Sequence, residues 1–303
     1  MKCLFSKWMI VIIAGLCFAQ ACNNPMNAVA ANFQIQPVED KAISTNPKPD
    51  HIVIVVMENH DYWQIMGSRE APYINSLAKD TFSANFTRSY IIEHPSQPNY
   101  LDFYSGSNQG VYDDIHPEHE PFTTPNLGRQ LIDSGKSFTT YSEDLPAIGY
   151  NGDRYGDYVR KHNPAANWMG IGKNQIPVTT NQPFTAFPSD YTKLPTVSLV
   201  VPNEINDMHN GSVIAGDTWV KNNLDGYVQW AKTHNSLFIL TFDEDNYGSN
   251  EQIVTIFIGS MVKGGAYKLT INHFNVLRTI EWMYGLPYIG KAANVKTINN
   301  CWR

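Results

Sequence analysis

The chain has 303 residues, of which 43% are hydrophobic and 12% aromatic, which is enough apolar material for a substantial core. Only 17% of the residues are charged, which excludes disorder as the main state. The 22 Lys and Arg residues against 28 Asp and Glu residues give a net charge of −6 without a basic block, which argues against a nucleic-acid-binding surface. Four cysteines, three of them within the first 22 residues, exclude a disulfide scaffold.

The chain begins with an apolar segment that is too short to cross a bilayer. Two lysines precede a run of twelve apolar residues within 1–21, whereas a membrane-spanning helix needs about 17–25. This pattern predicts a secretory signal peptide, cleaved before Cys22 or as late as residue 30. We therefore expect an exported protein, periplasmic or secreted, without a transmembrane segment. Cys22 leaves alternatives open: a lipid anchor, which would make the protein a lipoprotein, or a disulfide with Cys301.

Residues 22–49 are rich in Asn, Pro and Ala and are expected to form a loose lead-in. Beyond them, four short apolar runs predict strands. The runs are continuous rather than alternating, as is typical of strands buried on both faces of a mainly parallel sheet. Helix-compatible segments alternate with these strands, which predicts a single α/β domain over residues 50–303 with helices on both faces of the sheet. The expected strands are 52–57, 196–201, 237–242 and 253–258, and the expected helices are 72–79, 124–134, 217–233 and 275–284.

One long segment fits neither pattern. Residues 141–195 are rich in Gly, Pro, Asn and Tyr and follow no clear period. We expect them to form a loop-rich excursion that caps the sheet, with their aromatic side chains packed down onto it.

Polar side chains follow three of the predicted strands. Glu58 and Asn59 come directly after the first strand, and Asp243 and Glu244 directly after the third. In open α/β sheets, ligands bind beyond the carboxyl ends of the strands. Polar loops without a function are common, but Glu58 and Asp243 each follow an apolar strand directly, with no residue between the strand and the carboxylate. We expect them to be partly desolvated and therefore to need a cation.

A serine and two histidines add candidates for chemistry. Ser96 precedes Pro98 at an expected helix start, where the helix dipole stabilises an anion. On the residues alone, Ser96 is better explained as a helix cap, and a nucleophilic role requires a metal from the edge that carries Glu58 and Asp243. His209 lies two residues after Asp207, and a nearby carboxylate would suit it as an acid. His273, at the start of the last helix, either contacts a phosphate or caps the helix.

Several motifs in this order resemble the bacterial and fungal phosphoesterase family, which contains secreted acid phosphatases and phospholipases C and is related to the alkaline phosphatase superfamily. The resemblance covers residues 50–287. It implies a three-layer α/β/α sandwich with a mainly parallel, alkaline-phosphatase-like sheet. The motifs are 57–60 (Met-Glu-Asn-His), 95–100 (Pro-Ser-Gln-Pro-Asn-Tyr), 201–209 (Val-Pro-Asn-Glu-Ile-Asn-Asp-Met-His), 241–245 (Thr-Phe-Asp-Glu-Asp) and 273–281 (His-Phe-Asn-Val-Leu-Arg-Thr-Ile-Glu).

The resemblance also implies a site built around one divalent metal ion and a serine that is transiently phosphorylated. His209 and His273 would lie near the phosphate, and Asn99 and Asp207 are assigned to substrate binding. Oxygen ligands without cysteine suit Ca²⁺, Mg²⁺ or Mn²⁺, and Zn²⁺ also accepts carboxylates. The metal ligands implied are Glu58, Asn59, Ser96, Asp243 and Glu244.

We therefore expect an exported phosphomonoesterase of the acid phosphatase type, acting on a small phosphomonoester. Thr is common at the nucleophile of the phospholipase branch, so Ser96 favours the phosphatase branch. Two alternatives stay open: a phospholipase C or phosphodiesterase acting on lipid head groups, and a non-catalytic surface binding protein on a degenerate phosphatase fold. The chain is short for the family, which implies a reduced cap.

Overall fold

A computed structural model describes residues 46–248 and 250–303 of the chain. The predicted signal peptide, Cys22 and most of the predicted lead-in lie outside the described residues. Within the described part of the chain, no helix combines the length and the apolar character that a bilayer span would require.

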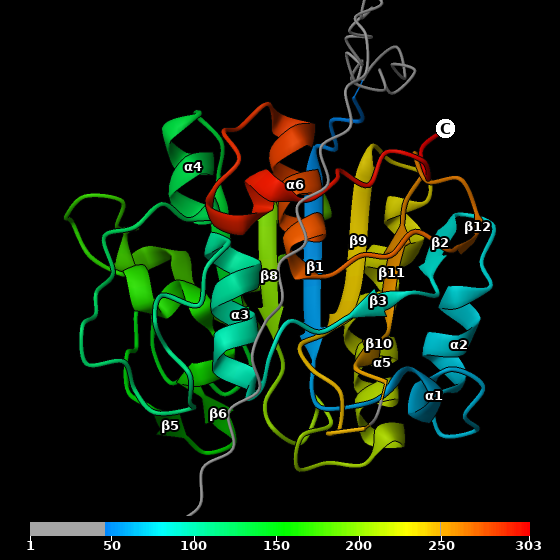
Figure 1. Ribbon diagram of the computed structural model, residues 1–303, viewed down its shortest axis with the longest axis horizontal. Helices are drawn as coiled ribbons and strands as arrows, with labels where there is room; N and C mark the ends of the chain where they lie inside the picture. Colours follow the sequence, from blue (N-terminus) through cyan, green and yellow to red (C-terminus); the bar gives the residue numbers. More distant parts are fainter. Residues whose placement is uncertain (1–45, 249) are drawn as a thin grey trace, which may run out of the picture. The chain divides into compact units, whose positions relative to one another are not determined.

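The described chain alternates strands and helices, and its longer elements coincide closely with the apolar runs of the sequence (Figure 1). The strands are β1 (His51–Met57), β2 (Ser83–Phe86), β3 (Ser89–Tyr90), β4 (Phe138–Ser142), β5 (Arg154–Tyr155), β6 (Tyr158–Val159), β7 (Asn181–Pro183), β8 (Val197–Val201), β9 (Ser236–Phe242), β10 (Gln252–Ile253), β11 (Thr255–Ile258) and β12 (Gly265–Tyr267). The α-helices are α1 (Tyr62–Ile65), α2 (Pro72–Ala78), α3 (Ser96–Ser105), α4 (Leu127–Asp133), α5 (Val213–Ala231) and α6 (His273–Tyr284).

The central sheet has eight strands in the order β12-β2-β11-β9-β1-β8-β4-β7. The strands from β9 to β7 in this order run parallel, and β11 pairs antiparallel with both β9 and β2. The predicted α/β class with a mainly parallel sheet is therefore confirmed. The last predicted strand, 253–258, is divided between two strands: β11 pairs antiparallel in the central sheet, whereas β10 pairs with β3 in a separate two-stranded sheet.

Both faces of the sheet are buried, as continuous apolar strands require. In β1, the side chains of Ile52, Ile54 and Val56 pack into one hydrophobic cluster. Those of Val53, Val55 and Met57 pack into a second cluster on the opposite face. Because successive side chains of a strand point to opposite faces, the two clusters lie on either side of the sheet.

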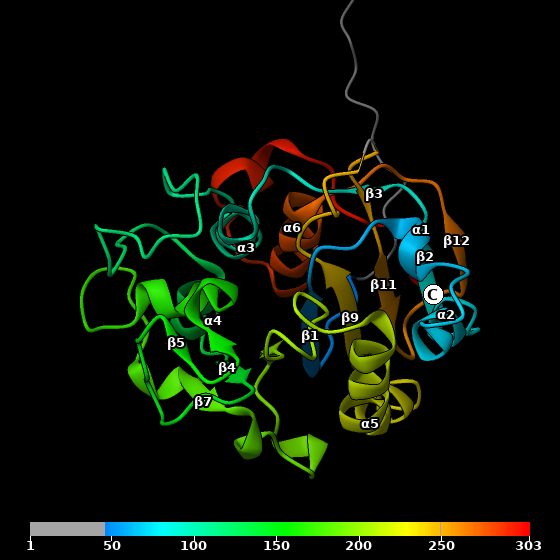
Figure 2. The same ribbon diagram turned by 90° about the horizontal axis from the view of Figure 1, so that it is seen from below.

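Helices cover each of these faces, so that the fold is a three-layer sandwich. Residues of α3, α4 and α6 contribute to the first cluster. Residues of α1, α2 and α5 contribute to the second. Seen along the strands, α3 and α6 lie on one side of β1 and β9, and α5 lies on the other (Figure 2).

Residues 141–195 contain little regular structure beyond the short strand pair β5–β6, the edge strand β7 and five 3-10 helices. The segment is nonetheless tied to the sheet, because it begins within β4 and contributes the edge strand β7. The 3-10 helices are η1 (Arg160–His162), η2 (Pro164–Trp168), η3 (Val178–Thr180), η4 (Phe184–Ala186) and η5 (Tyr191–Lys193), and a sixth, η6 (Gly290–Asn294), follows α6.

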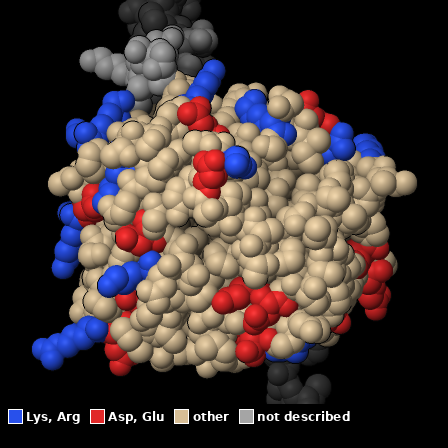
Figure 3. All heavy atoms as spheres, turned by 180° about the vertical axis from the view of Figure 1, so that it is seen from behind, with Lys and Arg blue, Asp and Glu red and all other residues tan. Residues whose placement is uncertain are grey.

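On the face opposite that of Figure 1, the described Lys and Arg side chains are scattered and form no continuous patch (Figure 3). Acidic side chains gather near the lower edge of this face (Figure 3), which is the edge toward which β1 and β9 run in Figure 1.

Candidate active site

The carboxyl ends of β1 and β9 bring two acidic residues together. The two strands are parallel neighbours, and Met57 is paired with Phe242. Glu58 and Asp243 follow these residues directly, so they leave the sheet side by side. The backbone amide of Asn59 donates to Asp243 Oδ1 at 3.2 Å, which locks the two strand ends together.

Ser96 meets these strand ends from the side. It is the first residue of α3, and its Oγ lies 3.0 Å from Glu58 Oε2 and 3.0 Å from Glu244 Oε1. Asn59 Oδ1 lies 3.4 Å from the same Oγ. The single hydroxyl proton can serve only one of these oxygens at a time. Several oxygens thus converge on one point next to a helix N-terminus, where a negative charge is stabilised.

The helix that carries Ser96 is enclosed by the rest of the protein. All ten residues of α3 are buried. One turn beyond Ser96, the hydroxyl of Tyr100 donates to Glu58 Oε1 at 2.6 Å. Glu58 is therefore held at both of its oxygens by the same helix, which fixes the carboxylate against Ser96. Tyr100 belongs to the motif Pro-Ser-Gln-Pro-Asn-Tyr, but its role could not be predicted from the sequence.

The buried carboxyl groups resist ionisation. Burial, with a contribution from the neighbouring Glu244, raises the pKa of Asp243 to about 7. Burial also raises the pKa of Glu244 to about 7. The pKa of Glu58 is raised well above its usual range by burial first, and then by the charges of Asp243 and Asp207. Such a cluster of like charges out of water would be stabilised by a cation among its oxygens.

The oxygens of this cluster fit a divalent metal ion. Asp243 Oδ2 is buried and has no hydrogen-bond partner. The terminal amide of Asn59 faces Glu244 Oε1 and Glu58 Oε2, to which it donates at 3.0 and 2.9 Å when its nitrogen points inward. Turned the other way, its oxygen joins the carboxylates and Ser96 Oγ around one point. These are hard oxygen donors, the kind that Ca²⁺, Mg²⁺ and Mn²⁺ prefer and that Zn²⁺ accepts.

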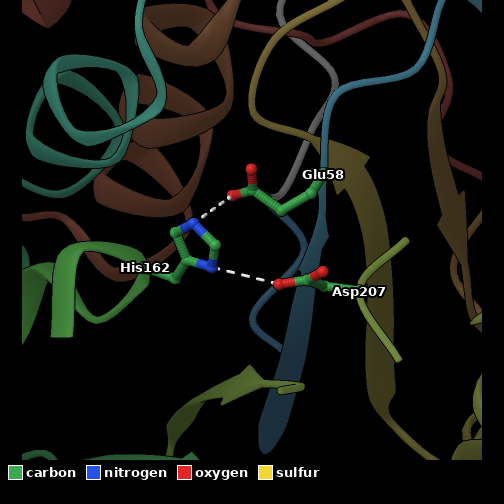
Figure 4. Close-up of side chains that lie close together, drawn as sticks. All are labelled: Glu58, His162 and Asp207. Carbon is green, nitrogen blue, oxygen red and sulfur yellow. Dashed lines mark hydrogen bonds and ion pairs between the residues drawn. The ribbon is translucent and has the colours of Figure 1, made fainter. Parts of the chain in front are cut away.

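A histidine that the sequence analysis missed lies on the other side of Glu58. Figure 4 shows the ring of His162, from η1, between the carboxylates of Glu58 and Asp207. His162 Nε2 lies 3.2 Å from Glu58 Oε1, and Nδ1 lies 3.0 Å from Asp207 Oδ2. All three side chains are buried, and one ligand atom from each could hold a metal ion. His162 lies in the aperiodic segment 141–195 without a motif around it, so no sequence signal marked it.

Burial shifts the pKa of each of these three groups in the direction that favours its uncharged form. The pKa of Asp207 is raised well above its usual range by burial, and that of His162 is lowered well below its usual range by burial and by the charge of Lys161. The ring of His162 stacks on Tyr100, with centroids 5.3 Å apart. The imidazole is thus fixed in orientation by two carboxyls and one aromatic ring.

The other predicted site residues occupy distinct positions around the cluster. The backbone amide of His209 donates to Asp207 Oδ1 at 2.8 Å, and its ring lies 5.8 Å from that of His162. His209 is partly exposed, whereas Asp207 is buried. The structure therefore brings His209 to the rim of the site and Asp207 to its interior.

His273 and Asn99 lie close to the cluster and bond to its backbone. His273 Nε2 lies 2.6 Å from the carbonyl oxygen of Asp243, and burial lowers the pKa of this histidine to about 4. The neutral ring therefore donates to that carbonyl. Asn99 Nδ2 donates to the carbonyl oxygens of Glu93 and Pro95 at 2.5 and 3.2 Å, and its Oδ1 accepts from backbone amides of the same loop. The predicted contacts of both residues with substrate stay predictions.

His94 supports the site from outside. Its Nδ1 lies 2.6 Å from Glu244 Oε2, and its Nε2 lies 2.9 Å from Asp245 Oδ1. Its ring stacks on that of Tyr247, with centroids 4.1 Å apart. His94 thus orients the carboxylate of Glu244, whose other oxygen faces Ser96.

Replacing His94 by alanine is expected to weaken divalent-metal binding by about 10- to 100-fold, because a free carboxylate must be ordered before it can bind. The measurement is activity as a function of metal concentration, with saturating metal restoring most of the rate. His234→Ala removes a second ring-stacked histidine, one that is exposed and lies just beyond α5, and should leave the metal dependence unchanged. An unaltered metal dependence in His94→Ala would show that His94 does not position Glu244.

Comparison with solved structures identifies the fold. A protein of the alkaline phosphatase superfamily from Vibrio parahaemolyticus matches with a TM-score of 0.57 at 14% identity, over 82% of this chain and 70% of that chain. A sulfatase from Pseudoalteromonas sp. matches with a TM-score of 0.52 at 11% identity, over 85% of this chain and 74% of that chain. The chain therefore shares its fold with these two proteins.

The sequence comparisons are more specific. The model of the Phosphoesterase family matches residues 68–287. A phosphatidylinositol-3-phosphatase of Mycobacterium tuberculosis is 43% identical over 86% of this chain and 85% of its own length. An acid phosphatase of Aspergillus fumigatus is 28% identical over 80% of this chain and 57% of its own length. The chain belongs to the Phosphoesterase family and is a phosphoric ester hydrolase, so the alternative of a non-catalytic binding protein is not retained.

Proposed function

We propose that the protein is an exported phosphomonoesterase of the acid phosphatase type that works through a phosphoserine at Ser96. The observation that carries this proposal is the position of Ser96 Oγ, 3.0 Å from a carboxylate oxygen of Glu58 and 3.0 Å from one of Glu244, at the start of a buried helix. The named relatives from Mycobacterium and Aspergillus are both phosphatases, which supports a monoester over a diester substrate. Export rests on the signal-peptide pattern of the sequence alone.

Ser96 acts first as the nucleophile. Its Oγ attacks phosphorus, a bond from Oγ to phosphorus forms, and the bond from phosphorus to the ester oxygen of the alcohol breaks. The hydroxyl proton passes to a carboxylate that it already contacts, Glu58 or Glu244. The departing alkoxide takes a proton from His209, the partly exposed histidine at the rim.

Water completes the cycle. It attacks phosphorus on the side opposite Ser96, gives its proton to His209, and the bond from phosphorus to Oγ breaks. Ser96 takes back its proton from the carboxyl group, Glu58 or Glu244, that accepted it in the first step, and inorganic phosphate leaves. In this scheme His162 and Tyr100 hold Glu58 in place, and His273 holds the backbone at Asp243.

Glu58, Asn59, Ser96, Asp243 and Glu244 would hold one divalent metal ion. A divalent ion at this point supplies positive charge that lowers the pKa of the Ser96 hydroxyl and offsets the charge of the phosphoryl oxygens. Calcium, magnesium, manganese and zinc are all compatible with these donors, because each accepts carboxylate and amide oxygens.

A covalent intermediate gives the direct test. Mixing the protein with a ³²P-labelled phosphomonoester and quenching in acid should leave acid-stable label on the protein, at Ser96 in a peptide map. Steady-state rates on p-nitrophenyl phosphate should exceed those on p-nitrophenylphosphorylcholine by a wide margin. The reverse preference would favour the phosphodiesterase or phospholipase C alternative, and hydrolysis without any labelled serine would reject the phosphoserine mechanism.

A further inference from the structure

A cavity of about 390 Å³ lies beside the first turn of α3, within the range of about 300–1,000 Å³ found for small-molecule sites. Gln97, the residue after Ser96, forms part of its wall. The backbone amide of Gln97 donates to Asp114 Oδ1 at 3.0 Å, and its side-chain amide donates to the carbonyl of Ile115 at 2.7 Å. The wall of the cavity is therefore fixed to the helix that carries the nucleophile.

The wall of this cavity contains an ion pair. Lys161 Nζ donates to Asp114 Oδ2 at 2.7 Å, and both side chains line the cavity. The residue after Lys161 is His162, whose ring lies 3.2 Å from Glu58. The positive charge of Lys161 also acts on the carboxyl groups of Glu58 and Glu244. The pair thus lines the cavity, and the charge of Lys161 reaches the carboxyl groups of the reaction centre.

The lining of the cavity is polar and electrically balanced. Its described residues include three carboxylates and three cationic side chains. Arg154 is paired with Glu204 at 2.6 Å, in addition to the pair of Lys161 with Asp114. No Phe, Tyr or Trp is among the described residues that line it. The carboxylates are Asp114, Asp153 and Glu204, and the cationic side chains are Arg154, Arg160 and Lys161.

This chemistry favours neutral hydroxyl groups over other partners. A hydroxyl both donates and accepts hydrogen bonds, so it can donate to a carboxylate and accept from an adjacent ammonium group. Asp114 has a free lone pair on each oxygen, and Lys161 has unused N–H groups after its one bond. A second phosphate would meet three carboxylates, and the three cationic side chains are each already paired with a carboxylate. A quaternary ammonium group would lack aromatic rings to stack on, and an aryl group would bury charged side chains.

We infer that the cavity holds the alcohol part of the substrate and that the pair Asp114–Lys161 selects phosphomonoesters of polyhydroxylated alcohols, such as sugars and cyclitols. This inference rests on the proposed phosphomonoesterase function. The phosphoryl group occupies the cluster at Ser96 and the polyol lies in the cavity. After the ester bond breaks and the alkoxide takes up a proton, the neutral alcohol departs from the cavity.

A pair of substrates that differ only in ring hydroxyls tests the inference. Wild-type protein should have a higher kcat/KM for myo-inositol monophosphate than for cyclohexyl phosphate. Lys161→Met and Asp114→Asn should each lower the ratio of the two kcat/KM values about tenfold, the effect of losing one hydrogen bond to a charged group. The ratio cancels any change at the reaction centre that both substrates share. Lys193→Met, which removes an exposed lysine outside the cavity, should leave the ratio unchanged.

Two results would overturn the inference while leaving the proposed function in place. One is a wild-type protein that hydrolyses both esters with equal kcat/KM. The other is a folded Lys161→Met or Asp114→Asn variant, judged by thermal unfolding, that keeps the wild-type ratio. If wild-type protein hydrolyses neither of these esters nor p-nitrophenyl phosphate, the proposed function itself fails.

The same polyol chemistry can come from a free phosphate ester or from a lipid head group. Soluble dibutanoyl phosphatidylinositol 3-phosphate and the long-chain lipid in phosphatidylcholine vesicles present an identical head group. Faster hydrolysis of the vesicle substrate would identify a lipid source, and equal or faster hydrolysis of the soluble ester would identify a free one. Either result supports a polyol in the cavity, whereas hydrolysis of both that is insensitive to Lys161→Met would count against it.

Discussion

Replacing Ser96 by alanine is expected to lower kcat at least about a thousandfold, because no other hydroxyl can form the covalent bond to phosphorus. The nearby hydroxyl of Tyr100 cannot replace that of Ser96, because it already donates a hydrogen bond to Glu58 at 2.6 Å. The fold should survive, because the Ser96 hydroxyl bonds to the carboxylate cluster and not to the backbone. Steady-state turnover and thermal unfolding of the purified variant measure the two effects.

Ser105 offers a matched control at the other end of the same helix. It is also buried, and its hydroxyl donates to the backbone carbonyl of Leu101 at 2.8 Å. Ser105→Ala should therefore keep near wild-type turnover. A Ser96→Ala protein that retained more than a few per cent of activity would refute the nucleophile assignment. A Ser96→Ala protein that had lost its cooperative unfolding transition would show instead that the hydroxyl is structural.

Removal of divalent metal is expected to lower activity at least about 100-fold. It is also expected to lower Tm by about 5 °C, which is the shift caused by losing a ligand present at about 100 times its Kd from a protein of this size. The physical reason is that the oxygens of Glu58, Asp243 and Glu244 repel one another without a cation. The experiment is dialysis against a chelator, followed by metal analysis and by addition of calcium, magnesium, manganese or zinc singly. Full activity after complete metal removal would contradict the assigned metal site.

The same cluster predicts an unusual pH dependence for the metal-free protein. The pKa values of Asp243 and Glu244 are raised by burial from 3.8 and 4.5 to about 7 in the folded state. The folded state therefore binds more protons than the unfolded state between about pH 4 and pH 7, and stability falls as pH rises through this window. Metal-free protein should accordingly gain Tm when the pH is lowered from 8 to 5.

Two variants and one comparison isolate that effect. Burial also raises the pKa values of Asp102 and Glu281, each to about 8, and these act with the same sign whether or not metal is present. Glu244→Gln should flatten the pH slope of the metal-free protein, whereas Glu281→Gln should flatten it equally with and without metal. With metal bound, protons compete with the ion for Asp243 and Glu244, so acidification should raise Tm less than in the metal-free protein. The same slope in both forms would place the metal elsewhere.

The sequence pattern was sufficient for those parts of the fold that are apolar and continuous. The first and third predicted strands match β1 and β9 within a residue, and their polar successors converge because parallel neighbours end at one edge. β4 escaped prediction, because Phe-Thr-Thr-Tyr-Ser is largely polar although most of its side chains are buried. Its buried hydroxyl groups form hydrogen bonds with residues distant in the sequence, such as that of Thr140 with Asn181 at 3.1 Å. The sequence around β4 does not indicate these partners.

The site residues, too, could be predicted only where the local sequence carries a signal. Glu58, Asp243 and Ser96 carry local signals, namely an acidic residue directly after a strand and a serine before Pro98. His162 carries none, because its position beside Glu58 depends on how η1 packs against α3. The sequence likewise did not reveal what His273 contacts, since the carbonyl of Asp243 is brought to it only when α6 packs beside β9.

The complete burial of α3 has a consequence for efforts to alter the protein by mutagenesis. Random substitution within Ser96–Ser105 would yield mostly misfolded molecules, because each side chain there is surrounded on all sides. Libraries aimed at new substrates should instead vary exposed loop residues such as Ile115, because loops tolerate change.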